Sequence, residues 1–491
     1  MTLQSILRHS SVYLIGDLVR RSVGLLLLPF YTHYLSPSDY GTIELLDLAI
    51  MVTSLVFGIS AAGDAMVRVY HEQPDDKSRG NVVSTMIWLI CFLGSAVTIV
   101  GVLFAGPLSR WLFKSDLTAL VRLAFFTMSF SALTELLMLY QQIRGRHLVW
   151  VACSVAQTLA LISLNIYFIA GRRMGIWGFL TSKCIVVVIA VVVLLIATIR
   201  ETSWAFRWPL AKHLIAFGSP LIISSSSAFI VHFSDRFFLS RYSTLADLGV
   251  YALAYKMGML VSVFVGGPFG AVWNATFYSH LAKTSWRSDF ARTLLYLSAT
   301  AAFVAVGISA FSRPVIGMAA TAGYWGAIAL VPVIAVAYGL RSIGDFFRGM
   351  LFITKKSRLF GILCAICAAL NLVLNTLLIP SFGIFGAAWA TLITWAAYLA
   401  ACCWFAQREN PLPVHPRHYA ALAGLTAVAI AAAVLGAGNS SVQQIGLGLV
   451  VVIAFIGGLI LFDLISREDR ERFANLLLTG RARIAAAVRS W

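Results

Sequence analysis

Charged residues inside apolar runs are the residues of this sequence whose types and spacing could do chemistry. Arg341, Asp345 and Arg348 follow one another at helical intervals and would share one helix face. One carboxylate cannot neutralise two guanidiniums, and Lys256 has no acid within a helical turn. Embedded charges cost at least ~2.5–3.5 kcal/mol each in hydrocarbon, so each needs a partner or a wet cavity.

Such cations suit a ligand that carries phosphate. Arg offers a planar fork for two phosphate oxygens, whereas Lys acts as a point charge. Arg21, four residues after Asp17, is a further cation of this kind. We predict that Arg21, Lys256, Arg341 and Arg348 line a cavity that binds a diphosphate. Structural pairing with acids and snorkelling of the side chains to an interface are the alternatives.

Polar and acidic side chains in the same runs complete the candidate site. Asn371 and Asn375, four residues apart, could hydrogen-bond sugar hydroxyls or link helices. A carboxylate in a poorly solvated cavity can take up a proton when the cavity changes the side to which it opens. Six acids are therefore candidates for coupling to an ion gradient: Asp17, Glu44, Asp47, Glu135, Asp235 and Asp345.

The elements that hold these residues follow from composition. Of the 491 residues 60% are hydrophobic and 12% are charged, against ~45–50% and ~25% in soluble domains. The bilayer must be the solvent, and a crossing helix needs ~20 apolar residues. We expect an all-α polytopic membrane protein with about fourteen transmembrane helices, at 10–34, 40–63, 81–105, 117–140, 149–170, 174–199, 213–235, 246–273, 290–311, 324–346, 359–379, 383–406, 418–436 and 442–465.

The net charge is +17, and the basic residues that produce it are distributed as in membrane proteins rather than as in nucleic-acid binders. Of the 37 Lys and Arg residues, 24 fall on one set of alternate connections and tails and 7 on the other. Because basic connections stay inside, we expect a multi-pass membrane protein with both termini cytoplasmic. No nucleic-acid partner is expected.

An internal repeat divides the chain. Residues recur after 208 positions, from Asp39 and Gly41 to Asp247 and Gly249, and from Gly175 to Gly383. An even number of helices per copy gives parallel bundles around a central cavity. We expect six-helix bundles at 1–210 and 211–410, two further helices at 411–465, and a cytoplasmic amphipathic basic tail at 466–491.

Cofactor and metal chemistry have little support in the sequence. The seven cysteines lie within apolar runs, and Cys364 and Cys367 have no second ligand pair beside them. The sequence also lacks the phosphate-binding loop pattern G-x-x-x-x-G-K-[ST], so we do not expect ATP hydrolysis by a P-loop mechanism. We expect no cofactor, no metal and no enzymatic activity.

Two segments carry a resemblance to a known family. The first reads Leu25-Leu26-Leu27-Leu28-Pro29-Phe30-Tyr31-Thr32-His33-Tyr34-Leu35-Ser36-Pro37-Ser38-Asp39-Tyr40-Gly41. The second begins Ser234-Asp235-Arg236-Phe237-Phe238-Leu239 and continues from Leu248-Gly249-Val250-Tyr251 to Lys256. Both resemble the polysaccharide transporter family, the Wzx-like flippases of the multidrug/oligosaccharidyl-lipid/polysaccharide (MOP) exporter superfamily.

The resemblance implies a flippase with a cationic lumen. Its cargo would be undecaprenyl-diphosphate-linked oligosaccharide, moved across the bacterial inner (cytoplasmic) membrane for synthesis of O-antigen, capsule or exopolysaccharide. The implied partners are this lipid-linked oligosaccharide, membrane lipids, a glycan polymerase and a chain-length regulator.

Three alternatives remain open at this point. Lipid II flippases resemble the chain less, because their first helix continues with an Arg-Asp pair where this sequence has Gly24-Leu25-Leu26. A multidrug exporter of the same superfamily would favour an acidic lumen. A membrane-embedded glycan polymerase or ligase would need a larger outward loop.

Overall fold

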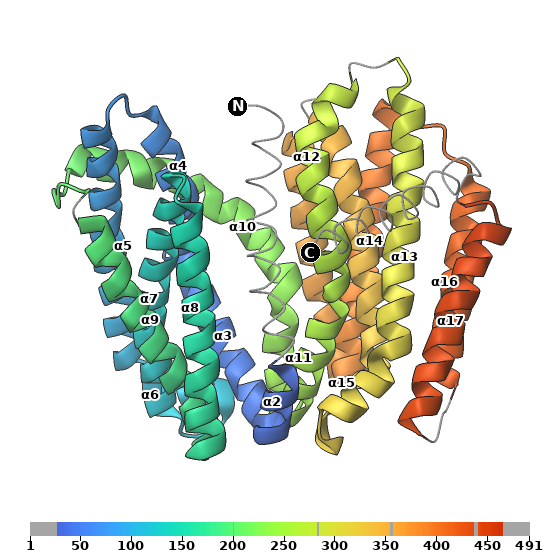
Figure 1. Cartoon of the computed structure of the whole chain (residues 1–491), viewed down its shortest axis with the longest axis horizontal. Coiled ribbons are helices and arrows are strands. Elements are labelled where there is room, and N and C mark those ends of the chain that lie inside the picture. Colours follow the sequence, from blue (N-terminus) through green and yellow to red (C-terminus); the bar gives the residue numbers. More distant parts are fainter. Residues whose placement is uncertain (1–26, 200, 282–283, 354–356, 437–439, 465–491) are drawn as a thin grey trace, which may run out of the picture. The chain divides into compact units, whose positions relative to one another are not determined.

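A computed structural model describes residues 27–199, 201–281, 284–353, 357–436 and 440–464. Asp17, Arg21 and the expected tail at 466–491 lie outside these residues. The described residues form helices joined by turns (Figure 1). The helices are α2 Leu28–Tyr34, α3 Pro37–Val56, α4 Ile59–Glu72, α5 Asp76–Leu103, α6 Ala105–Phe113, α7 Thr118–Ile143, α8 His147–Asn165, α9 Gly175–Ile199, α10 Trp208–Tyr242, α11 Leu245–Gly258, α12 Gly267–Leu281, α13 Trp286–Ala319, α14 Ala327–Ile353, α15 Ser357–Glu409, α16 Pro416–Leu435 and α17 Ser441–Leu461.

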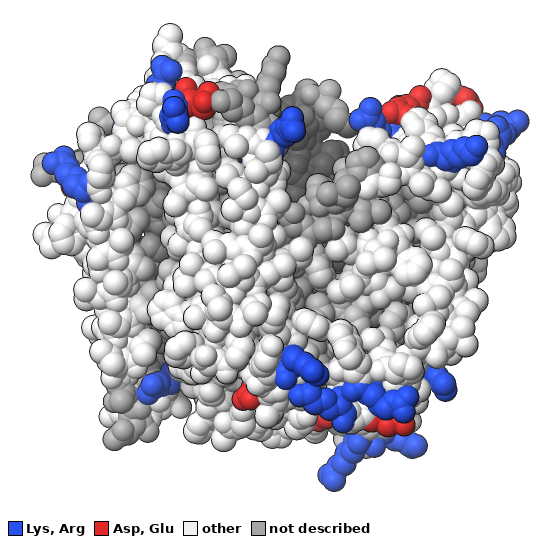
Figure 2. Space-filling view, turned by 180° about the vertical axis from the view of Figure 1, so that it is seen from behind, with Lys and Arg blue, Asp and Glu red and all other residues white. Residues whose placement is uncertain are grey.

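The helices confirm a polytopic membrane protein. Within the described part of the chain, ten helices are long and apolar enough to cross a bilayer, and a bent pair, α3 with α4, is a further candidate. One of the ten, α15, breaks at Gly383, whose φ of 54° is not helical. On the face drawn in Figure 2, charged side chains gather at the helix ends and leave an uncharged band between. The count of fourteen stays a prediction.

Helix boundaries differ from expectation at three places. The helix expected at 40–63 is interrupted at Gly58, which adopts a left-handed φ of 72°. The helix expected at 246–273 contains a π-helical turn, Ser262–Gly266, between α11 and α12. The helix expected to end at residue 235 continues to Tyr242 as α10.

The 208-residue repeat appears in local geometry. Ser36 and Asp39 form a capping box at the start of α3, and Thr244 and Asp247 exchange the same two hydrogen bonds at the start of α11. Gly175 and Gly383, also 208 apart, share a φ of 54°. The two copies therefore begin equivalent helices with equivalent caps.

Equivalent glycines of the two copies lie against each other. A Cβ added to Gly41 would lie 2.0 Å from the Leu245 carbonyl oxygen, and one added to Gly249 would lie 1.9 Å from the Pro37 carbonyl oxygen. Leu245 is itself 208 residues after Pro37, so the two contacts are reciprocal. Only glycine allows α3 and α11 to approach this closely.

The chain divides into two compact units. The first comprises residues 1–253, 319–325 and 368–387, and the second comprises 254–318, 326–367 and 388–491. In the first unit α7 packs against α5 and α9, and α10 packs against α3 and α4. In the second, α13, α16 and α17 share an apolar core that includes Val306, Leu422 and Phe455. The bundle boundaries at 210 and 410 stay predictions.

The orientation in the membrane can be tested at the two ends of α7. A periplasm-specific reporter inserted after Ser115 should be active. The same reporter inserted after Gly145 should be inactive, because Gly145 lies in the more basic set of connections, which is expected inside. Enzyme activity in whole cells is the measurement. The reverse pattern would contradict the expected orientation.

Candidate functional site

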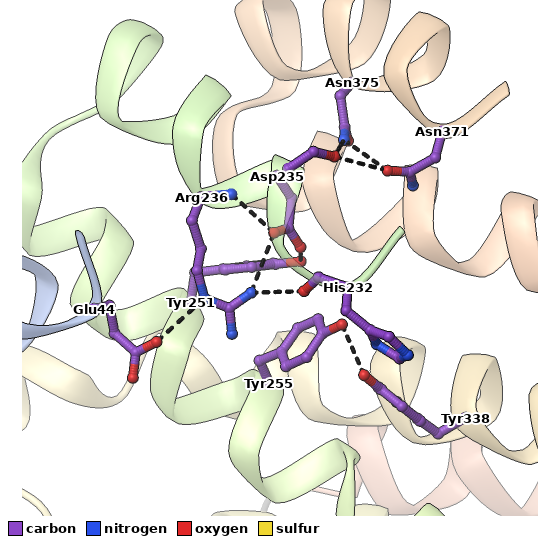
Figure 3. A network of polar contacts seen from close by, with 10 residues as sticks. Glu44, His232, Asp235, Arg236, Tyr251, Tyr255, Tyr338, Asn371 and Asn375 are labelled. Carbon is purple, nitrogen blue, oxygen red and sulfur yellow. Dashed lines mark hydrogen bonds and ion pairs between the residues drawn. The ribbon is translucent and has the colours of Figure 1, made fainter. Parts of the chain in front are cut away.

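A buried charge network lies in the first unit. Asp235 and Arg236 of α10 are 1% and 3% exposed, and Glu44 of α3 is 7% exposed. Figure 3 shows these side chains converging from two helices, with Tyr251 of α11 beside Asp235. Ionisable groups buried in a membrane protein are expensive, so such a cluster marks a functional site.

Arg236 is the centre of this network. Its Nε donates to Glu44 Oε2 at 3.1 Å, and its Nη1 donates to Asp235 Oδ1 at 3.2 Å and to the His232 carbonyl oxygen at 2.9 Å. The guanidinium also lies over the ring of Phe233, 5.1 Å from its centroid. One cation thus holds two carboxylates from α3 and α10.

Asp235 accepts hydrogen bonds on both carboxylate oxygens. Oδ1 accepts from the Arg236 backbone N–H at 2.8 Å as well as from the guanidinium, and Oδ2 accepts from the Tyr251 hydroxyl. Tyr251 is fully buried. These donors come from α10 itself and from α11, so they fix the position of the Asp235 carboxylate between the two helices.

A second polar group adjoins Asp235 along the chain. Ser234 donates to Asn371 Oδ1 at 3.0 Å, and Asn375 Nδ2 donates to Ser234 Oγ and to Asn371 Oδ1 at 3.1 Å each. Both asparagines are fully buried, and Asn375 Oδ1 has no hydrogen-bond partner among the described residues. They link α10 to α15, which was one of the two roles expected for them.

A cationic cluster lies in the second unit. Asp345 is shared between Arg341 and Arg348 of the same helix, at 4.0 Å and 3.8 Å. The hydroxyl of Tyr398 donates to Asp345 Oδ1 at 3.0 Å. Both ion-pair distances exceed hydrogen-bond length. The two guanidiniums are partly exposed, so their N–H groups can still donate hydrogen bonds to a ligand.

Aromatic rings hold one of these guanidiniums in place. The Arg341 guanidinium lies 5.0 Å from the centroid of Trp395 and 5.8 Å from that of Tyr338. The Tyr338 hydroxyl in turn donates to Tyr255 of α11 at 2.7 Å. Stacking fixes the plane of the guanidinium and leaves its N–H edge available to an anion.

The other expected residues are dispersed. Lys256 and Glu135 have exposed side chains on α11 and α7. Asp47 forms an ion pair with Lys183 of α9, at 3.1 Å. The structure thus brings Glu44 together with Asp235, and Arg341 together with Asp345 and Arg348.

Two charged residues of these sites were missed in the sequence. The helix expected at 213–235 ends just before Arg236, but in the structure Arg236 lies inside α10 and is buried. Its adjacency to Asp235 within an otherwise apolar stretch was the available signal. Lys183 stands alone in its apolar run, and its partner Asp47 is 136 residues away, so no spacing pattern could pair them.

Metal ligation has no support in the described ranges. Among those residues no group of three or more His, Cys, Asp or Glu side chains could hold a metal ion. The seven cysteines are free thiols.

Comparison with known proteins places the chain in a family. The profile of the family described as polysaccharide biosynthesis protein matches residues 6–277. The chain belongs to this family. A relative within the curated proteins, an uncharacterized membrane protein of Haemophilus influenzae, is 24% identical over 264 residues. The match covers 53% of this chain, which spans only 62% of the length of that relative.

Solved structures share the fold of this family member. The lipid II flippase MurJ in an inward closed conformation matches with a TM-score of 0.75 at 13% identity, over 91% of this chain and 98% of that chain. A multidrug resistance MATE family transporter of the MOP superfamily in an inward-facing conformation matches with a TM-score of 0.63 at 15% identity, over 79% and 94%. The expected all-α membrane fold is confirmed. A flippase and a multidrug resistance transporter both have this fold.

Proposed function

We propose that this family member is a flippase for undecaprenyl-diphosphate-linked oligosaccharide repeat units at the bacterial inner membrane. Membership in the polysaccharide biosynthesis family and the fold shared with a flippase and an exporter support the reaction class. The observation that carries the choice of cargo is the cationic cluster of Arg341, Asp345 and Arg348.

The cluster suits a diphosphate. It carries one positive charge in excess, and the Arg341 guanidinium is stacked with its N–H edge available. Arginine binds phosphate oxygens in a bidentate geometry that lysine cannot reproduce. Lys256 and Arg21 are proposed to add charge to the same ligand. A cluster with excess positive charge disfavours the cationic drugs that an acidic lumen would take.

The second unit also contains an apolar groove that suits a lipid chain. Its volume is about 750 Å³, and α13, α14, α15 and α16 line it. Residues such as Leu294, Val336, Leu392 and Leu422 make its walls apolar, with few polar groups among them. An isoprenoid chain in this groove would exchange contacts with lipid for contacts with equally apolar side chains.

The buried network of Arg236, Asp235 and Glu44 is proposed to couple transport to an ion gradient. Its carboxylates lie on α3 and α10, so a movement between these helices would separate Glu44 from Arg236. A buried carboxylate that loses its cation is stabilised by a proton or a small cation. The other acids of the candidate set, including Asp47 and Glu135, remain proposals for this role.

A deletion strain tests the proposed function. Without the protein, and with no redundant flippase, repeat units should accumulate on the inner leaflet while surface polymer falls. Normal surface polymer in this strain would contradict the proposal. Accumulation of lipid II in place of oligosaccharide repeat units would identify a lipid II flippase instead. A glycan polymerase and a chain-length regulator are the proposed protein partners, which co-purification from the same cells would test.

Complementation of that strain tests the cationic cluster. Arg341→Ala should lower surface polymer by about tenfold or more, since a lost charged hydrogen bond to phosphate corresponds to about 1.5–3 kcal/mol. Arg341→Lys should restore only part of the activity, because it keeps the charge and loses the fork. Arg287→Ala replaces an exposed arginine on α13. It is the matched control and should leave the amount of surface polymer unchanged. Full activity of Arg341→Ala combined with Lys256→Ala would exclude this site.

A further inference from the structure

The first unit carries a group of basic side chains at the end that is expected to face outward. This outer basic group consists of Arg110 of α6, Lys114 at the end of that helix, Arg122 of α7 and Arg241 of α10, and all four residues are exposed. Figure 2 shows basic side chains crowded together below the uncharged band. Because Lys and Arg are generally scarce on outward connections, their concentration at this end indicates a specific role.

Contacts within the first unit hold the outer basic group together. Lys114 Nζ donates a hydrogen bond to the Arg241 carbonyl oxygen at 3.3 Å. The Ser109 hydroxyl donates to the Ser115 carbonyl oxygen at 3.0 Å and accepts from the Leu117 N–H at 2.6 Å, which fixes the connection between α6 and α7. Helix α6 also packs against both α7 and α10. The cations are therefore held at the ends of three neighbouring helices.

The acid of the same connection does not neutralise this group. Asp116 Oδ1 accepts hydrogen bonds from the Thr118 hydroxyl and backbone N–H. These bonds, with a smaller contribution from the nearby charges of Arg110 and Arg122, lower the pKa of Asp116 below its ordinary value. In the described part of the chain no ion pair joins a carboxylate to the outer basic group. Its positive charge is thus available to a ligand.

Helix α6 places exposed apolar side chains beside these cations. The residues of its buried face are Ala105, Ser109, Leu112 and Phe113. Arg110 and Trp111 lie on the opposite face, and Trp111 is 59% exposed, with its ring packed on Phe237 at 5.4 Å between centroids. Leu103 and Phe104, just before α6, are also exposed. Exposed aromatic rings next to cations are typical of the membrane–water interface, where the rings enter the lipid and the cations meet the headgroups.

We propose that the outer basic group binds the phosphate groups of anionic phospholipids, such as phosphatidylglycerol, in the leaflet at this end of the first unit. Arg and Lys form charge-assisted hydrogen bonds with phosphate, and each cation near an anionic membrane surface strengthens binding by about fivefold. An acidic protein or glycan would satisfy the cations but not the exposed rings of Trp111 and Phe104, which favours lipid. The inference is independent of the cargo, because it depends only on α6, α7 and α10.

Photo-crosslinking at Trp111 tests the inference on the full-length protein in nanodiscs, with phosphatidylglycerol as the minor lipid and phosphatidylcholine as the major one. Benzoylphenylalanine replaces Trp111 and keeps an aromatic ring there, and mass spectrometry identifies the lipid class of each adduct. We expect phosphatidylglycerol to exceed its share of the bilayer by about fivefold or more. The same probe in place of Trp325, an exposed tryptophan just before α14, should capture both lipids in proportion to their shares.

Two triple variants locate the effect. The first removes three charges from the outer basic group: Arg110→Gln, Lys114→Gln and Arg122→Gln. The second removes three charges from exposed positions of the second unit: Arg287→Gln, Arg408→Gln and Arg417→Gln. With the probe at Trp111, the first should lower phosphatidylglycerol to its share of the bilayer, and the second should leave it enriched. Both should melt like the wild type, because exposed side chains contribute little to stability.

Three results would overturn the inference. They are phosphatidylglycerol at its bilayer share in the adducts of the protein without charge changes, enrichment that persists in the first triple variant, and an equal loss in the second. Binding of hyaluronan that is lost in the first triple variant, together with unbiased lipid capture, would assign the group to an acidic glycan instead. Because this assay needs no transport, its outcome is separate from that of the deletion strain.

Discussion

Replacing Arg236 with alanine should lower the free energy of unfolding by about 3–5 kcal/mol, the effect of removing one partner from a buried ion pair. Arg236 is 3% exposed and is the cation that holds both Glu44 and Asp235. Its loss removes the cation that both of these buried carboxylates pair with. Thermal melting in detergent, calibrated against chemical unfolding, is the measurement.

A control on the same helix separates charge from burial. Arg241 lies five residues later on α10 and is exposed, so Arg241→Ala should change stability by no more than about 0.5 kcal/mol. The variant Arg236→Met with Glu44→Gln and Asp235→Asn removes all three charges and should recover part of the loss. Equal melting of Arg236→Ala and the wild type would show that the network does not stabilise the fold.

Replacing Gly249 with alanine should destabilise the first unit by about 3 kcal/mol or more, at the upper end of overpacking effects. The added Cβ would lie 1.9 Å from the Pro37 carbonyl oxygen, and backbone atoms cannot rotate away as a side chain can. Gly41→Ala should have a similar effect through the Leu245 carbonyl oxygen at 2.0 Å. The yield of folded protein and its melting temperature are the measurements.

The double variant and a matched glycine sharpen this test. The double variant Gly41→Ala, Gly249→Ala should lose less stability than the two single variants together, because one displacement of α3 from α11 relieves both clashes. Gly307→Ala in α13, where a Cβ meets nothing within 4 Å, should stabilise by about 0.5–1 kcal/mol through helix propensity. Additive losses would mean that the two glycines act independently and that the reciprocal contact is wrong.

Properties set by neighbours in sequence could be predicted. Composition and helical spacing were sufficient to predict an all-α membrane protein and to group Arg341, Asp345 and Arg348 on one face, as the structure shows. The 208-residue offset predicted the equivalence of Gly41 and Gly249. That these glycines also touch depends on the packing of α3 against α11, which no periodicity reveals.

Properties set by distant partners could not be predicted. A fall in hydropathy at Asp235 and Arg236 looked like a helix end, yet α10 continues because Glu44 and Tyr251 from other helices satisfy both charges. Asp47 pairs with Lys183, which lies 136 residues away in the chain. The aromatic support of Arg341 comes from Trp395, 54 residues away in the chain. Each of these is a tertiary contact without a local signature.

The most direct test of the proposed function is flipping by the purified protein in proteoliposomes that contain undecaprenyl-diphosphate-linked N-acetylglucosamine. An added galactosyltransferase and labelled UDP-galactose modify only the sugar that faces the outside. With the wild-type protein the whole lipid pool should become labelled, Arg341→Ala should slow this, and Arg287→Ala should not. Labelling that stops at the outer-leaflet fraction with the wild-type protein, as in protein-free vesicles, would contradict the flippase assignment.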